Sequence, residues 1–169
     1  MQFNFDLAQI IGIVASALII SAFAFKSDHS YKYFVMLGAA MFALHFYLLG
    51  ALVAVFVNII NATRTASSIK FHRSNYLLIF FIFCYLIIGF FVYETPRDML
   101  PIFSGCLSSF AMFKLSGIKL RLCMYISAIS WIFYAISVFS IGGIITETFI
   151  IIINSITIYR LFKDKKNAV

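Results

Sequence analysis

Basic residues interrupt this chain at four places, and their spacing limits the possible folds more than any other feature. All but one of the 13 Lys and Arg residues fall in four segments, 26–32, 64–73, 114–121 and 160–166. Between them lie apolar runs long enough to cross a bilayer, since a spanning helix needs about 20 mostly apolar residues. Positive residues gather at the cytoplasmic ends of membrane spans. The pattern therefore predicts an integral membrane protein.

Composition agrees with this prediction. The 169 residues are 63% hydrophobic and 11% charged, whereas soluble domains have about 45–50% apolar and about 25% charged residues. The net charge of +7 could suggest nucleic-acid binding, but the basic clusters between apolar runs are explained by topology, so no nucleic-acid partner is expected. Cys84, Cys106 and Cys123 lack CxxC spacing, which indicates neither a disulfide framework nor a zinc site. No metal or cofactor is expected.

Seven membrane-spanning helices are predicted from the apolar runs. Their expected bounds are Leu7–Phe25, Tyr33–Leu49, Ala51–Ser67, Tyr76–Tyr93, Met99–Leu115, Leu122–Val138 and Ile144–Phe162. The second and third are nearly continuous, and Gly50 is the expected reversal. The sixth and seventh are expected to be joined by Ser140-Ile141-Gly142-Gly143, because glycine tolerates the positive φ of a tight turn.

Seven spans place the four basic segments on one side of the membrane. By the positive-inside rule that side is the cytoplasm, so the N-terminus is expected outside and the C-terminal tail inside. The first six residues contain no Lys or Arg, so the first apolar run is expected to be a retained helix and not a signal peptide.

The chain also carries a weak internal repeat. Phe-Tyr, a glycine, an apolar run and an Asn followed six residues later by Arg occur in 45–64 and again in 132–160. Each triplet of spans would start with small residues, which are Gly12, Ala15 and Ser16 in the first and Gly105, Ser108 and Ser109 in the second. We therefore predict a first three-helix repeat over 1–73, a linker helix over 74–96, a second repeat over 97–162 and a basic tail over 163–169. An odd linker helix makes the two repeats parallel, with a pseudo-twofold axis along the membrane normal.

Five segments of the chain together form a distinctive set of motifs. They are LAQIIGIVA, LHFYLLGALVA, NATRT, LPIFSGCLSSFAMF and SIGGIITETF. They resemble the YgjV family of bacterial inner-membrane proteins. The resemblance covers almost the whole chain and implies a multi-pass protein of the bacterial inner membrane. It also implies a distant relation to the SWEET and PQ-loop (MtN3-like) group, whose three-plus-one-plus-three plan matches the repeat above. The chain departs from that group in having no Pro-Gln pair and only Pro101 within a span, so gating by prolines in several helices is not expected.

Two asparagines are the leading candidates for substrate contacts. Asn58 and Asn154 would lie near the middles of the third and seventh spans, where an amide is costly unless it finds a partner. As equivalent positions of two parallel repeats, they are expected to face each other across the pseudo-twofold axis. SWEET-like proteins use asparagines in these two helices, so the resemblance implies a solute-binding role. Two readings stay open: the pair faces a polar cavity, or it forms an interhelical hydrogen bond that only holds the bundle together.

Glu147 and His45 are candidates for a proton-sensitive outer gate. Glu147 would be the one acid within a span, and intramembrane carboxylates are functional hypotheses by default. His45 is expected at a similar depth, where it could pair with Glu147. The alternatives are a structural hydrogen bond or a Glu147 side chain that reaches the interface.

Trp131 and Tyr134 are candidate lining residues of a sugar-sized cavity, with membrane-interface anchoring as the alternative. Arg64 and Arg160 are interpreted as topology anchors.

No enzyme signature such as GxSxG, HExxH or a Walker A motif occurs, so we expect no enzymatic activity. The expected protein is all-helical, sits in the lipid bilayer and moves a small polar solute as a SWEET-like facilitator or proton-linked transporter. The alternative is a non-transporting membrane receptor or assembly factor. One chain holds both repeats, and dimers or trimers are equally compatible with the sequence.

Overall fold

The computed structural model describes residues 6–22, 28–71, 74–115 and 117–167, and within them the chain is all-helical. Its elements are α1 (Leu7–Ala22), α2 (Asp28–Leu48), α3 (Leu52–Lys70), α4 (Asn75–Val92), the 3₁₀ turn η1 (Pro96–Asp98), α5 (Met99–Lys114), α6 (Gly117–Ser137) and α7 (Ile141–Asn167). The seven α-helices predicted from the apolar runs are confirmed.

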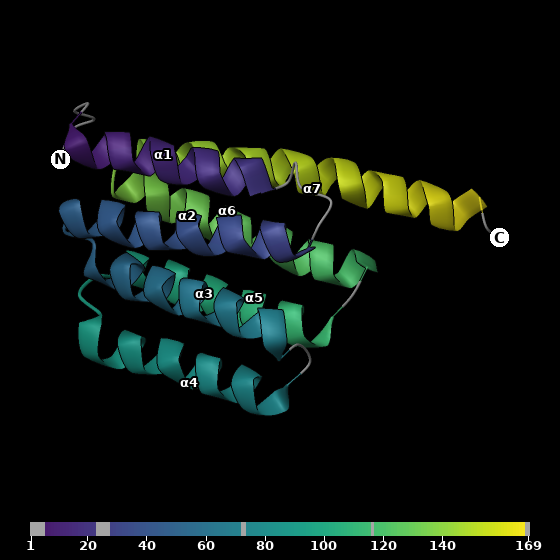
Figure 1. The fold of residues 1–169 in the computed structure, drawn as a ribbon, viewed down its shortest axis with the longest axis horizontal. Coiled ribbons are helices and arrows are strands. Elements are labelled where there is room, and N and C mark those ends of the chain that lie inside the picture. The colour runs from purple at the N-terminus through teal and green to yellow at the C-terminus, as the bar shows by residue number, and fades with distance from the viewer. Residues whose placement is uncertain (1–5, 23–27, 72–73, 116, 168–169) are drawn as a thin grey trace.

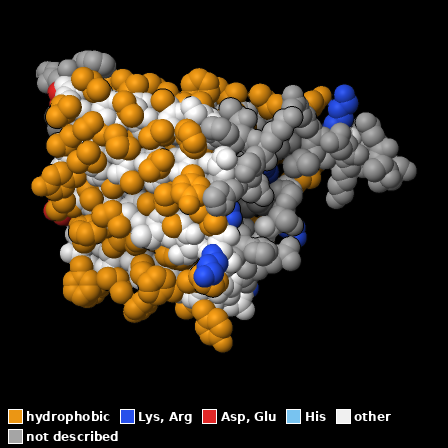
Figure 2. All heavy atoms as spheres, viewed as in Figure 1, with side chains coloured by type: hydrophobic (Ala, Val, Ile, Leu, Met, Phe, Trp, Pro, Cys, Tyr) orange, Lys and Arg blue, Asp and Glu red, His pale blue; other side chains and the backbone are white. Residues whose placement is uncertain are grey.

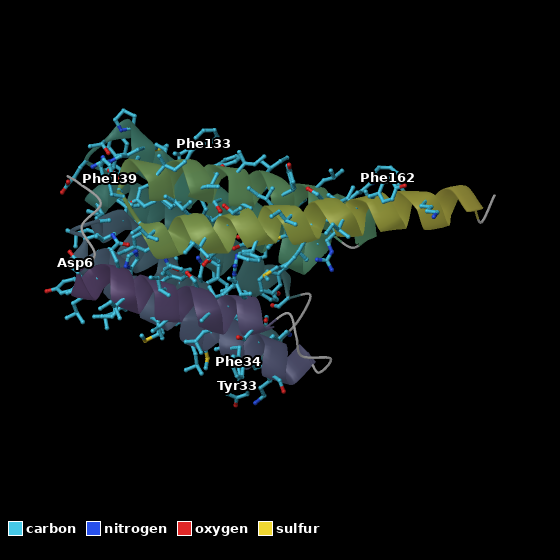
Figure 3. All side chains as sticks on the ribbon, turned by 90° about the horizontal axis from the view of Figure 1, so that it is seen from above. Asp6, Tyr33, Phe34, Phe133, Phe139 and Phe162 are labelled. Carbon is cyan, nitrogen blue, oxygen red and sulfur yellow. The ribbon has the colours of Figure 1, made fainter. Side chains whose placement is uncertain are left out.

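The helices run side by side along the long axis of the molecule and alternate in direction (Figure 1). One end of the bundle, here called the turn end, holds the α2–α3 and α6–α7 turns, with Asp6 and Phe139 (Figure 3). The opposite end is called the basic end, because α3, α5 and the start of α6 place cationic side chains there, namely Lys70, Lys114, Lys119 and Arg121. The C-terminal part of α7 extends past the other helices beyond the basic end (Figure 1).

The two tight turns have the same backbone hydrogen-bond pattern. At the first, the N–H of Gly50 donates to Tyr47 O and the N–H of Ala51 to Phe46 O. At the second, Phe139 and Ser140 repeat these bonds 89 residues later, to Ile136 O and Ala135 O. Both are Schellman caps, and both put the central residue in the left-handed region, Gly50 at φ 70° and Phe139 at φ 57°. The reversal predicted at Gly50 is confirmed.

The prediction that Gly142 and Gly143 make the second turn is wrong. Both lie inside α7, which starts at Ile141 and not at Ile144. Gly142 is needed for packing instead: a Cβ at this position would collide with the backbone carbon and oxygen of Gly12 in α1. The turn itself is made by Phe139, which holds positive φ without being a glycine.

Six helices form a ring and α4 packs outside it. Neighbours in the ring are α1 with α2, α2 with α3, α5 with α6, and α6 with α7. The ring closes where α1 packs on α7 and, less extensively, where α3 packs on α5. We call these two contacts the α1–α7 seam and the α3–α5 seam. Helix α4 lies against α5 and α3, at the second seam.

Apolar side chains cover much of the outer surface (Figure 2). On α4, Tyr76, Phe90 and Phe91 are 88%, 83% and 76% exposed, which water would penalise and lipid would accept. By length and hydropathy α3 and α4 each qualify alone as a membrane span, and four other helices have apolar stretches of 10–17 residues. The basic side chains visible in Figure 2 lie toward the basic end.

Candidate functional site

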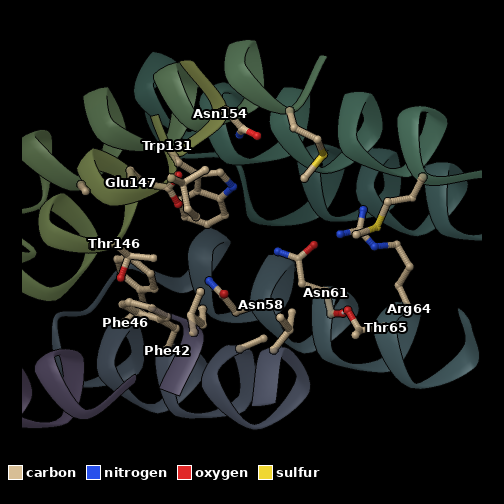
Figure 4. Close-up of a pocket in the computed structure, with 18 of the residues that line it drawn as sticks. Phe42, Phe46, Asn58, Asn61, Arg64, Thr65, Trp131, Thr146, Glu147 and Asn154 are labelled. Atoms are coloured by element: carbon tan, nitrogen blue, oxygen red, sulfur yellow. The ribbon is translucent and has the colours of Figure 1, made fainter. Parts of the chain in front are cut away.

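A cavity of about 520 Å³ lies in the middle of the helix ring (Figure 4). All six ring helices contribute side chains to its wall and α4 contributes none. The polar and aromatic lining residues are Phe42, Phe46, Asn58, Asn61, Arg64, Thr65, Arg121, Trp131, Thr146, Glu147 and Asn154. Ligand pockets usually measure about 300–1,000 Å³, so the space suits a small solute.

Aromatic side chains form the wall of the cavity nearest the turn end. Trp131 stacks on Phe46, with ring centroids 5.9 Å apart, and Phe42 also stacks on Phe46, at 5.9 Å. Trp131 therefore lies where the cavity hypothesis places it. Tyr134 does not line the cavity: it packs behind Phe46 and Trp131 in the core, with 1% of its surface exposed.

The α3 helix supplies four polar side chains to the cavity wall at helical spacing, Asn58, Asn61, Arg64 and Thr65. Asn58 is 6% exposed and donates from Nδ2 to the carbonyl of Ala54, 2.9 Å away, within its own helix. The Oδ1 of Asn61 accepts a 2.8 Å hydrogen bond from the hydroxyl of Tyr85 in α4. Ile59, which follows Asn58, is 46% exposed on the outer surface, so the helical spacing turns the polar face of α3 inward.

Asn58 and Asn154 both line the cavity, but they are not equivalent positions. Asn58 and Glu147 each lie six residues beyond the first residue of their helix, Leu52 and Ile141. Asn154 is seven residues further along, at the depth of Thr65 in α3. The expectation that the two asparagines face each other across a symmetry axis is therefore wrong. That expectation followed from the shared Asn-to-Arg spacing in the sequence. When the two tight turns are aligned instead, Asn58 corresponds to Glu147 and not to Asn154.

Asn154 lies beside a cation. The Nη1 of Arg121, at the start of α6, donates to Asn154 Oδ1 at 3.3 Å. A direct Asn58–Asn154 hydrogen bond, the structural alternative, is not among the contacts of these two amides. The side chain of Arg160, the other predicted anchor, lies outside the described residues.

His45 lies away from the cavity and has other partners than Glu147. It is fully buried, and its Nδ1 is 2.7 Å from Ala8 O while its Nε2 is 2.6 Å from Ser140 Oγ. Both ring nitrogens are thereby occupied, so the expected His45–Glu147 pair does not form. Glu147 lines the cavity on α7, next to Thr146, whose hydroxyl donates to Gly142 O at 3.0 Å.

Arg64 is the residue whose role the sequence reasoning missed. Its side chain is 5% exposed and lines the cavity, and Nη1 donates to Ser108 Oγ and Ser109 Oγ of α5, both at 2.8 Å. Its Nε is buried with no hydrogen-bond partner. A signal was available: the predicted span Ala51–Ser67 already runs past Arg64, and α3 continues to Lys70, so Arg64 lies inside the helix.

The cavity is electrostatically polarised. Arg64 and Arg121 are its cationic lining residues, and Glu147 is the one acid among the lining residues that the structure describes. Glu147 lies at the depth of Asn58, whereas Arg64 lies six residues further toward the basic end, about 9 Å at 1.5 Å per residue. Hydrogen bonds and charges in such a low-dielectric space act strongly on anything that enters it.

Comparison with known proteins gives one family and one curated relative. A family described as "bacterial inner membrane protein" (Imp-YgjV) matches residues 6–165. The inner membrane protein YgjV of Escherichia coli (strain K12) is 28% identical over 163 residues, which cover 96% of this chain and 88% of the relative. No solved structure matches the chain.

Proposed function

The chain belongs to the YgjV family of bacterial inner-membrane proteins, and from this premise we propose that it carries a small polar solute across the inner membrane. The single observation that carries the proposal is the polar cavity of about 520 Å³, walled by every helix of the ring. Inside a bilayer, such a space costs stability, because its polar groups lose water and its walls lose packing. Its presence therefore favours a functional role.

The proposal includes a three-plus-one-plus-three architecture, in which α1–α3 and α5–α7 are parallel repeats and α4 is the linker. Two observations support it. The pairings within α1–α3 recur within α5–α7, and the two tight turns share one hydrogen-bond pattern at a spacing of 89 residues. In a SWEET-like carrier the two triplets would rock against each other around the cavity between them. This role requires no enzymatic chemistry.

The proposed orientation places the basic end in the cytoplasm, with the N-terminus outside. It follows from the positive-inside rule applied to Lys70, Lys114 and Lys119 at the basic end, against Arg97 at the turn end. In this orientation the packed cluster of Phe46, Trp131 and Tyr134 closes the cavity on the outer side.

Uptake into proteoliposomes tests the proposal. Purified protein is offered labelled monocarboxylates, sugars and amino acids, and we expect saturable uptake of at least one of them. Asn58→Ala and Asn154→Ala each remove an amide from the cavity wall and should reduce that uptake about three- to tenfold, the effect of one hydrogen bond. Thr63→Ala is the matched control, because Thr63 is exposed on α3 and bonds only its own helix.

The outcomes are decisive. Uptake that the two asparagine variants reduce and Thr63→Ala leaves intact supports transport. If no solute enters, or if the asparagine variants match the wild type, the transport proposal fails and a receptor or assembly role replaces it.

A further inference from the structure

Arg64 is a buried cation whose charge no described neighbour neutralises. Its hydrogen-bond partners, Ser108 and Ser109, are neutral hydroxyls bound to Nη1 alone. Nε has no partner, although 95% of the side chain is withdrawn from solvent. A charge held in the interior of a membrane protein is expensive, and such residues mark substrate and ion pathways.

A second guanidinium adds positive charge at the same end of the cavity. Arg121 reaches the wall from α6 and makes one long bond, 3.3 Å, to the neutral amide of Asn154. Glu147 makes no ion pair with Arg64, whose hydrogen bonds among the described residues go to Ser108 and Ser109 alone. The basic end of the cavity therefore keeps two cationic groups with unused donors.

From this geometry we infer that the cavity binds a solute with one oxyanion group, held by Arg64 and Arg121. A guanidinium presents parallel N–H donors that match the two oxygens of a carboxylate or phosphate, and Nε of Arg64 is one such donor without a partner. The inference rests on the proposed function of the cavity and adds its substrate class.

The wall at the other end of the cavity limits the charge that the rest of the solute can carry. Toward the turn end the wall consists of Trp131, Phe42 and Phe46, with Glu147 as its acidic side chain. A second anionic group would lie against aromatic rings and an acidic side chain, none of which can neutralise it, and this is unfavourable. The favoured solute is a monoanion whose uncharged part packs on Trp131.

Binding is measured by the thermal unfolding of the purified full chain in detergent at constant ionic strength. The probes are butanoate, its neutral isostere butanamide, succinate and inorganic phosphate. We expect butanoate to raise the unfolding midpoint saturably, with at least tenfold weaker effects of butanamide and succinate. Phosphate separates the two oxyanion types: a response to phosphate and not to butanoate identifies a phosphate group as the ligand.

Two variants and one control connect the response to the cavity. Arg64→Lys keeps the charge but loses the planar fork, and should weaken binding at least tenfold. Arg121→Gln provides the same readout if Arg64→Lys does not fold. Thr63→Ala should bind like the wild type.

Several results would overturn the inference. Equal responses to butanoate and butanamide, or no response to either butanoate or phosphate, would do so. Equal binding by Arg64→Lys and Thr63→Ala would do so as well. If succinate bound as well as butanoate, the restriction to monoanions would be overturned. Failure of transport is distinguishable, because binding in detergent needs no transport. Anion binding without uptake supports this inference and counts against the carrier, whereas uptake of a neutral solute without anion binding does the reverse.

Discussion

The two seams that close the helix ring use the same kind of small residue for opposite purposes. At the α1–α7 seam the backbones of Gly12 and Gly142 touch directly. At the α3–α5 seam the corresponding small residue of α5, Gly105, makes room for the ring of Tyr85 from α4. The first seam brings two helices together, and the second admits a side chain from a third helix between them.

Polar contacts follow the same division. Across the α1–α7 seam, Ser16 donates to Gly142 O at 2.6 Å, and Gln9 donates to Phe139 O at 2.7 Å while accepting from Ile141 N at 2.9 Å. Ser16 has a short side chain, and the Gln9 amide is held at both its donor and its acceptor, so neither side chain has much freedom. Across the α3–α5 seam the bonds run through the long side chain of Arg64, which also faces the cavity. The comparison indicates a rigid seam and an adaptable one.

Gly142→Ala should have the largest effect, because its Cβ would meet the backbone of Gly12, which cannot rotate away. We expect it to lower the free energy of unfolding by about 3 kcal/mol, or roughly 6–12 °C in Tm. Gly89→Ala is the control, since its Cβ would meet only the end of the Ile102 side chain, at 3.1 Å. Equal Tm values for the two variants would show that the α1–α7 seam is not rigid.

Gly105→Ala should cost less, about 1–2 kcal/mol, because the obstacle is the ring of Tyr85 and α4 lies outside the helix ring. Removing that ring should rescue the variant: in a Tyr85→Leu background, Gly105→Ala should have almost no further effect on Tm. Additive losses in the double variant would mean that Tyr85 is not what Gly105 accommodates.

Ser140→Ala should destabilise the protein by about 1 kcal/mol. The hydroxyl accepts from Gly143 N at 3.0 Å, as an N-cap of α7, and lies 2.6 Å from His45 Nε2. Ser155→Ala removes an exposed hydroxyl bonded only to its own helix, and its chemical-denaturation midpoint should match the wild type. A Ser140→Ala midpoint equal to that of Ser155→Ala would contradict the cap and the His45 link.

Arg64→Leu should have the smallest effect on stability, within about 1 kcal/mol in either direction, because replacing a buried charge by an apolar side chain often costs nothing. It should nevertheless abolish the oxyanion response. A loss of about 3 kcal/mol or more would instead make Arg64 a structural brace of the α3–α5 seam.

Much of the fold could be predicted because membrane spans are governed by composition. The seven helices and the reversal at Gly50 follow from apolar length and glycine chemistry alone. The second reversal could not be predicted this way, because Phe139 holds positive φ in a sequence context with two better candidates, Gly142 and Gly143. Their true role depends on which helix packs against α7, a tertiary fact.

The candidate site was predictable only in part, for a similar reason. Asn58, Asn154, Trp131 and Glu147 line the cavity because polar or amphipathic side chains in a span turn away from lipid. Whether two of these side chains pair depends on their positions along their helices. Aligning the two repeats by their Asn-to-Arg spacing gave the wrong position for Asn154. Arg64 was missed because a cation near the end of an apolar run is usually an anchor, whereas here its buried side chain lines the cavity.

The most direct test of the central claim, that the cavity serves passage between the two sides, is thiol accessibility in membrane vesicles of both orientations. Asn58→Cys is placed in a chain whose three native cysteines are serine, and is exposed to a membrane-impermeant thiol reagent. Val57→Cys is the control, since Val57 is fully buried and absent from the cavity wall. The account predicts that Asn58→Cys reacts from both sides and Val57→Cys from neither. Reaction of Asn58→Cys from one side alone would contradict it.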